Sequence, residues 1–133
     1  MNLANVIDYL LRTTDQTHRF WGYYQVVTAA AVGFAWSPAA SSKEIIYWLM
    51  AAYIIFAIGN CILVSTSQST AREIWGAMQE YKKEQKESID SKFLSLIELN
   101  KPWSPKFVAG THVALSVAAV VAMYLSLCPS GYP

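Results

Sequence analysis

The stretch Ile45–Ser65 reads IIYWLMAAYIIFAIGNCILVS, and none of its 21 residues is Asp, Glu, Lys or Arg. At a rise of about 1.5 Å per residue, a helix of this length covers the roughly 30 Å hydrocarbon core of a bilayer. Two further uncharged apolar runs, Phe20–Ser37 and Phe107–Cys128, contain 18 and 22 residues. The sequence therefore predicts an all-α, polytopic membrane protein with three transmembrane helices.

The basic residues lie almost entirely on one side of these three crossings. Nine of the ten Lys and Arg residues precede the first run or fall in the connection 66–106, whereas Lys43 alone falls in the turn 38–44. Because Lys and Arg are enriched in cytoplasmic segments, we expect a cytoplasmic N-terminus and an external or periplasmic C-terminus in the plasma (inner) membrane. The formal net charge of +1 argues against a nucleic-acid partner.

The chain divides into four predicted segments. Leu3, Val6, Ile7 and Leu10 share one helical face, which predicts an amphipathic helix that lies in the inner headgroup layer or docks on the protein's own cytosolic part. The segments are an amphipathic N-terminal helix (1–18), a tight transmembrane hairpin (19–66, with crossings at 20–37 and 45–65), a cytosolic helical segment (67–104), and the third crossing with a short external tail (105–133).

Aromatic residues and prolines support the boundaries of the crossings. Trp21, Tyr24 and Trp103 fall at the predicted inner interface, where aromatic side chains form a belt. Ser104 and Pro105 predict the N-cap and the first turn of the third crossing, because proline is favoured at the first helical position. No breaker interrupts the sequence between the second crossing and Pro102, so the second helix is expected to continue into the cytoplasm.

Small residues recur every four positions along the third crossing. Since the hydrophobic effect does not drive helices together in lipid, such a row permits the close backbone approach that packing requires. This small-residue row predicts a helix-packing ridge, against the protein's own hairpin or against another copy, and the residues are Gly110, Ala114, Ala118, Ala122 and Ser126. Because three helices bury few faces internally, we expect a homo-oligomer.

Polar residues recur at one depth in all three crossings. Gln25, Asn60 and His112 each lie five residues from the inner end of their run, which places them about 7–8 Å inside the boundary. Thr111 and Ser116 lie within about a turn of the same level. Polar side chains at this depth are costly unless they face one another or water. The belt is therefore either inter-helix hydrogen bonding or a polar constriction with His112 as its titratable group.

The sequence offers little support for catalysis. It contains no carboxylate pair in or near the membrane, no Gly-rich phosphate loop and no zinc-ligand spacing, so we expect no enzyme, no metal and no cofactor. The leading hypothesis is a self-associating helical assembly that forms or gates a channel lined by the polar belt. The alternative is a non-catalytic accessory or scaffolding subunit that docks on other membrane proteins.

Overall fold

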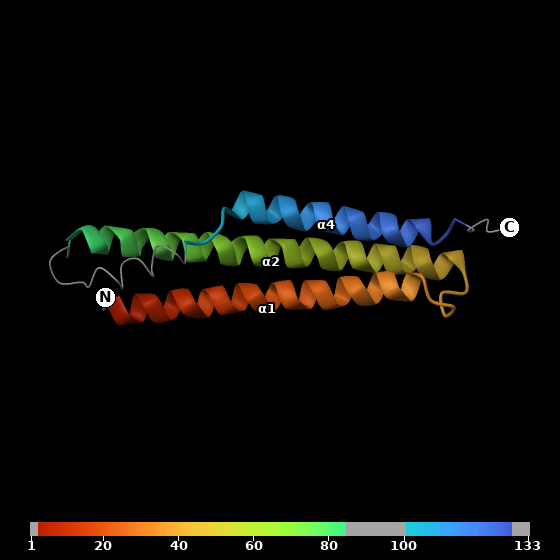
Figure 1. Cartoon of the computed structure of the whole chain (residues 1–133), viewed down its shortest axis with the longest axis horizontal. Helices are drawn as coiled ribbons and strands as arrows, with labels where there is room; N and C mark the ends of the chain where they lie inside the picture. The colour runs from red at the N-terminus through yellow and green to blue at the C-terminus, as the bar shows by residue number, and fades with distance from the viewer. Residues whose placement is uncertain (1–2, 85–100, 129–133) are drawn as a thin grey trace.

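The computed structural model describes residues 3–84 and 101–128, and these residues form three helices and no strand. The helices are α1 (Leu3–Ala35), α2 (Lys43–Glu84) and α4 (Pro105–Leu125). They lie side by side, with α2 antiparallel to α1 and α4 (Figure 1). The predicted all-α fold class is confirmed.

Two of the three helices are long and apolar enough to cross a membrane, α2 within Lys43–Glu80 and α4 over its whole length. Only 22% of the apolar window of each is buried, so the described part of the chain does not enclose either helix. The first helix does not meet the same criterion over its described residues, and the polar groups of Tyr23, Tyr24 and Gln25 lie near the start of its apolar run. A crossing by α1, and hence the count of three, stays a prediction.

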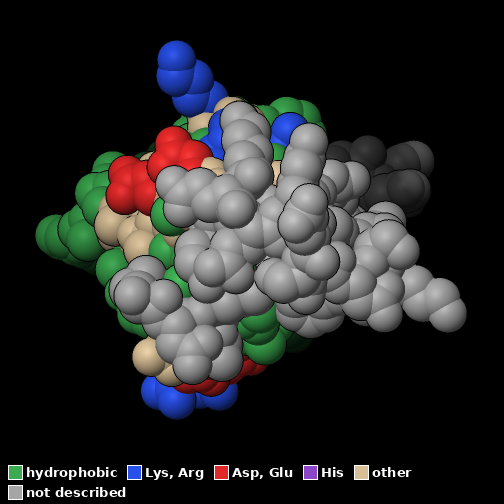
Figure 2. Space-filling model, turned by 90° about the vertical axis from the view of Figure 1, so that its left-hand side faces the viewer, with side chains coloured by type: hydrophobic (Ala, Val, Ile, Leu, Met, Phe, Trp, Pro, Cys, Tyr) green, Lys and Arg blue, Asp and Glu red, His purple; other side chains and the backbone are tan. Residues whose placement is uncertain are grey.

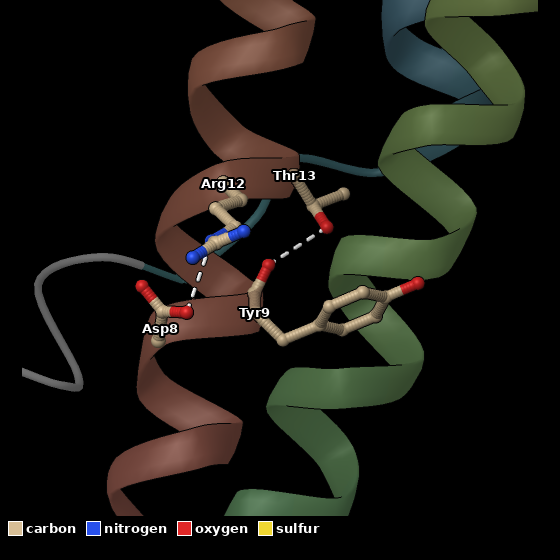
Figure 3. A network of polar contacts seen from close by, with 4 residues as sticks. All are labelled: Asp8, Tyr9, Arg12 and Thr13. Carbon is tan, nitrogen blue, oxygen red and sulfur yellow. Dashed lines mark hydrogen bonds and ion pairs between the residues drawn. The ribbon is translucent and has the colours of Figure 1, made fainter.

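The predicted N-terminal helix and the predicted first crossing are one continuous helix, α1, with no break near residue 18. The N-terminal half of α1 packs on the C-terminal half of α2, where Leu10, Ala71 and Met78 form a buried cluster. Of the two roles expected for the amphipathic stripe, the structure favours docking on the protein's own helix. The opposite face carries the ion pair between Arg12 Nε and Asp8 Oδ2 at 2.9 Å (Figure 3).

The second helix continues well beyond its apolar run, as the lack of a breaker predicts. Its 42 residues extend about 63 Å, roughly twice the thickness of a hydrocarbon core. At its start the Ile45 N–H donates to the Ser42 hydroxyl at 3.4 Å, an N-cap contact. Hydrogen bonds from the backbone N–H of Glu44 and from Ser42 hold the pKa of the exposed Glu44 carboxyl below its ordinary value. The negative charge therefore stays at the positive end of the helix dipole.

The third helix begins as predicted, with Ser104 as N-cap residue and Pro105 in the first turn, although the Ser104 side chain makes no capping bond. The principal core joins all three helices in the half of the molecule away from the N-terminus, and small residues there allow close helix contact. Its buried members are Tyr24, Ala31, Ala35, Tyr53, Ala57, Ala119 and Met123. Figure 2 views the opposite end of the molecule, where acidic and basic side chains are visible at the upper and lower edges.

Candidate functional site

A hydrogen-bonded pair of buried polar side chains connects α2 to α4. Asn60 on α2 is 6% exposed and His112 on α4 is 1% exposed. The Asn60 Nδ2 donates to the backbone carbonyl of Phe20 on α1 at 3.2 Å, so its Oδ1 is the acceptor in the 3.1 Å contact with His112 Nε2. This assignment puts the proton of the neutral imidazole on Nε2. One amide thus contacts all three helices.

A chain of hydroxyl groups extends this site across the bundle. Thr28 lies 3.0 Å from the Tyr53 hydroxyl, which donates to the Tyr24 hydroxyl at 3.3 Å. The Tyr24 hydroxyl lies 3.0 Å from Ser116 Oγ, and Ser116 donates to the His112 carbonyl at 2.8 Å. Since each hydroxyl has one proton, these contacts run in one direction from Thr28 to the backbone of α4. Each of these four hydroxyl groups therefore has an acceptor for its proton.

Aromatic rings enclose the imidazole on its α1 side. The Tyr24 ring centroid lies 4.0 Å from that of His112, and the Trp21 centroid lies 5.5 Å from it. Trp21 and Tyr24 meet edge to face at 5.7 Å. A groove of about 420 Å³ opens between α2 and α4 beside His112, but its walls are almost entirely apolar. The site is therefore a packed polar contact without an open polar channel through it.

The structure brings together three of the five residues of the predicted polar belt, Asn60, His112 and Ser116. The other two residues of the belt lie outside this hydrogen-bonded network. Gln25 is exposed on α1, and Thr111 is half-buried with its hydroxyl donating to the Phe107 carbonyl of its own helix at 3.0 Å. Counting residues from the ends of the runs gives depth in the membrane but not the direction of the side chain, which explains this division.

The two tyrosines of the network are residues that the sequence assigns to another role or leaves unassigned. Tyr24 is predicted in the interfacial aromatic belt, but the structure corrects this, since Tyr24 is 2% exposed and points into the bundle. Tyr53 is 3% exposed in the middle of the apolar run of α2. A phenol within a long apolar run is the signal that could have identified Tyr53, because a buried tyrosine needs a hydrogen-bond partner.

The predicted small-residue row of α4 faces mostly away from the rest of the chain. Gly110, Ala114 and Ala118 are exposed, whereas Ala122 and Ser126 are half-buried. The buried face of α4 is instead formed by Val108, His112, Ala119 and Met123. The row meets α1 at its outer end, where Trp36 Nε1 donates to the Ala122 carbonyl at 3.1 Å. The sequence allows the row to pack on the protein's own hairpin or on another copy, and the hairpin covers only the outer end of the row.

Comparison of the chain with protein-family models, with curated proteins and with solved structures finds no match. The geometry alone therefore has to indicate the function. Within residues 3–84 and 101–128, no group of three or more His, Cys, Asp or Glu side chains is arranged to hold a metal ion. What the site does chemically is to satisfy polar groups inside an apolar bundle, which fixes the relative position of three helices.

Proposed function

We propose that this chain is a non-catalytic integral membrane protein of three crossings that self-associates in the plasma membrane, with its N-terminus in the cytoplasm. The observation that carries the proposal is the outward direction of Gly110, Ala114 and Ala118 on α4. A Cβ atom added at Gly110 would meet nothing within 4 Å. The protomer thus leaves unused the kind of surface on which membrane helices pack.

A second exposed row on α1 supports the same proposal. Gln25, Ala29 and Gly33 are exposed and follow one another at four-residue spacing. An amide that faces hydrocarbon is unfavourable, because nothing in lipid replaces its hydrogen bonds with water. A second copy of the chain would cover Gln25 and offer it polar partners, as well as contact the two small residues beyond it.

Channel formation is the more specific form of this proposal. Asn60, His112 and Ser116 make their hydrogen bonds inside one protomer. A water-filled path between copies would therefore use Gln25, which is exposed outside the network at the same predicted depth. In this form the network holds the protomer rigid while Gln25 faces the pore.

The accessory-subunit alternative uses the same surfaces with a different occupant. Exposed aromatic side chains at the predicted interfaces, Trp48 at 77% and Trp103 at 65%, suit docking on other membrane proteins as well as contact with lipid headgroups. The two forms differ in whether the purified chain associates with itself.

Self-association is tested by single-molecule fluorescence counting of the labelled protein in liposomes over a range of protein-to-lipid ratios. We expect oligomers from the wild-type chain and monomers from Ala118→Leu, because leucine prevents close approach along the row. Ala51→Leu is the matched control, since Ala51 is also exposed but lies on α2. A monomeric wild-type chain at every ratio would leave the accessory-subunit alternative.

The proposed orientation is tested with the natural thiol of Cys128, which is free and exposed. A membrane-impermeant maleimide added to intact cells should label Cys128, and the Cys128→Ser variant should lose the label. Labelling that requires permeabilised cells would place the C-terminal end inside and would contradict the proposed topology.

A further inference from the structure

A cavity of about 390 Å³ lies where α1, α2 and the beginning of α4 meet. Its walls include Thr14 and Trp21 of α1, Gln68 of α2, Trp103 of the segment before α4, and Thr111 of α4. Counted from the ends of the apolar runs, Thr14 lies about 9 Å outside the predicted inner boundary and Thr111 about 6 Å inside it. The cavity therefore spans the depth of lipid headgroups and glycerol groups.

The ionisable side chains that line the cavity are basic. Lys101 and His18 belong to the lining, and among residues 3–84 and 101–128 no Asp or Glu does. The Lys101 Nζ lies 5.3 Å from the centroid of the Trp75 ring, a cation–π contact that positions the ammonium group. The carboxylate of Asp15, which follows Thr14 in the sequence but does not line the cavity, pairs with Arg19 at 2.8 Å. The cavity thus presents a positive charge that suits a phosphate group.

The rest of the polar wall offers hydrogen-bond acceptors. Thr14 Oγ1 donates its proton to the Leu10 carbonyl at 2.9 Å, so this oxygen can act toward a ligand only as an acceptor. Gln68 contributes its side chain to the same wall. Trp21 and Val108 add apolar wall on the membrane side.

We infer that this cavity binds the headgroup of a phospholipid that carries both a phosphate and a hydrogen-bond donor, such as phosphatidylglycerol. Lys101 contacts the phosphate, Thr14 accepts a hydrogen bond from a headgroup hydroxyl, and the tryptophans flank the glycerol region. This inference rests on the membrane placement given under Proposed function. A soluble glycerol phosphate shares the same polar chemistry but lacks the acyl chains.

The test is native mass spectrometry of the full-length protein in mild detergent with equal amounts of phosphatidylglycerol and phosphatidylcholine, whose headgroup has no hydrogen-bond donor. We expect at least fivefold more bound phosphatidylglycerol than phosphatidylcholine. Lys101→Gln should reduce this ratio to near one. Lys106→Gln is the matched control, because Lys106 is an exposed lysine close in sequence that does not line the cavity. Far-UV circular dichroism verifies that both variants are folded.

Equal retention of the two lipids by the wild-type chain, or an unchanged ratio in Lys101→Gln, would overturn the inference. Displacement of the bound lipid by millimolar glycerol 3-phosphate would indicate a soluble phosphate ligand and would likewise overturn the lipid assignment. The same spectra report the mass of the protein assembly. A monomer that retains phosphatidylglycerol separates failure of self-association from failure of this site, and solubility without detergent would refute both.

Discussion

The two faces of α4 use polar and small residues in opposite ways. The buried face carries His112, whose ring bonds to Asn60 and packs on Tyr24, while the outward face carries the exposed small residues Gly110 and Ala118. One face specifies how three helices pack within a chain, and the other is free to pack on a partner. Substitutions on the first should change protomer stability, and those on the second should change association.

The largest effect on stability is expected from His112→Ala. This change removes a side chain that is fully packed and hydrogen-bonded, so we expect a loss of about 3 kcal/mol in the free energy of unfolding. Unfolding by sodium dodecyl sulfate in mixed micelles, followed by far-UV circular dichroism, measures it. Thr111→Ala is the control, with an expected loss below about 0.5 kcal/mol because Thr111 bonds only within its own helix. Equal losses in both variants would contradict the difference between the two faces.

The two amides at the same predicted depth should respond in opposite ways to replacement by leucine. Asn60→Leu removes two inter-helix hydrogen bonds and leaves His112 Nε2 unpaired, which should cost about 1–2 kcal/mol. Gln25→Leu replaces an exposed amide and should leave the protomer as stable as before, or more stable, while it weakens self-association. The same unfolding assay, combined with fluorescence counting in liposomes, measures both effects. A larger loss of protomer stability for Gln25→Leu would show that the amides are assigned to the wrong faces.

The phenol hydroxyls provide a finer comparison. Tyr24→Phe interrupts the hydroxyl chain between Tyr53 and Ser116, and we expect a loss of about 1 kcal/mol. Tyr23→Phe serves as control, because Tyr23 is 63% exposed and adjoins Tyr24 in the sequence. The ratio of the two losses reports whether Tyr24 points inward. A comparable loss of stability for Tyr23→Phe would show that Tyr24 is not the buried phenol of this pair.

The smallest effect on the protomer is expected from Gly110→Ala. The added methyl group meets open space, so the free energy of unfolding should stay within about 0.5 kcal/mol of the wild-type value or rise slightly through better helix propensity. Any loss of oligomer in the fluorescence assay would then come from contacts between copies. A protomer destabilised by more than about 1 kcal/mol would mean that Gly110 is not on the outward face.

The sequence predicts the elements of this fold better than it predicts the faces of the helices. The start of α4 at Ser104 and Pro105 and the extension of α2 follow from local rules, because proline position and the absence of breakers act within a few residues. Which side of α1 faces the bundle depends on the helices that pack against it. Depth in the membrane therefore does not predict that Tyr24 is buried and that its neighbour Gln25 is exposed. The single α1 helix was likewise not predicted, since a change from charged to apolar residues does not end a helix.

The most direct test of the inward-facing network is a double-mutant cycle between Asn60 and His112, with Asn60→Ala, His112→Ala and the double variant. The free energy of unfolding is measured at a protein-to-lipid ratio at which the chain is monomeric. The account predicts a coupling energy of about 1 kcal/mol, typical of a hydrogen bond between membrane helices. Additive effects of the two substitutions, with no coupling, would contradict a contact between these side chains within one protomer.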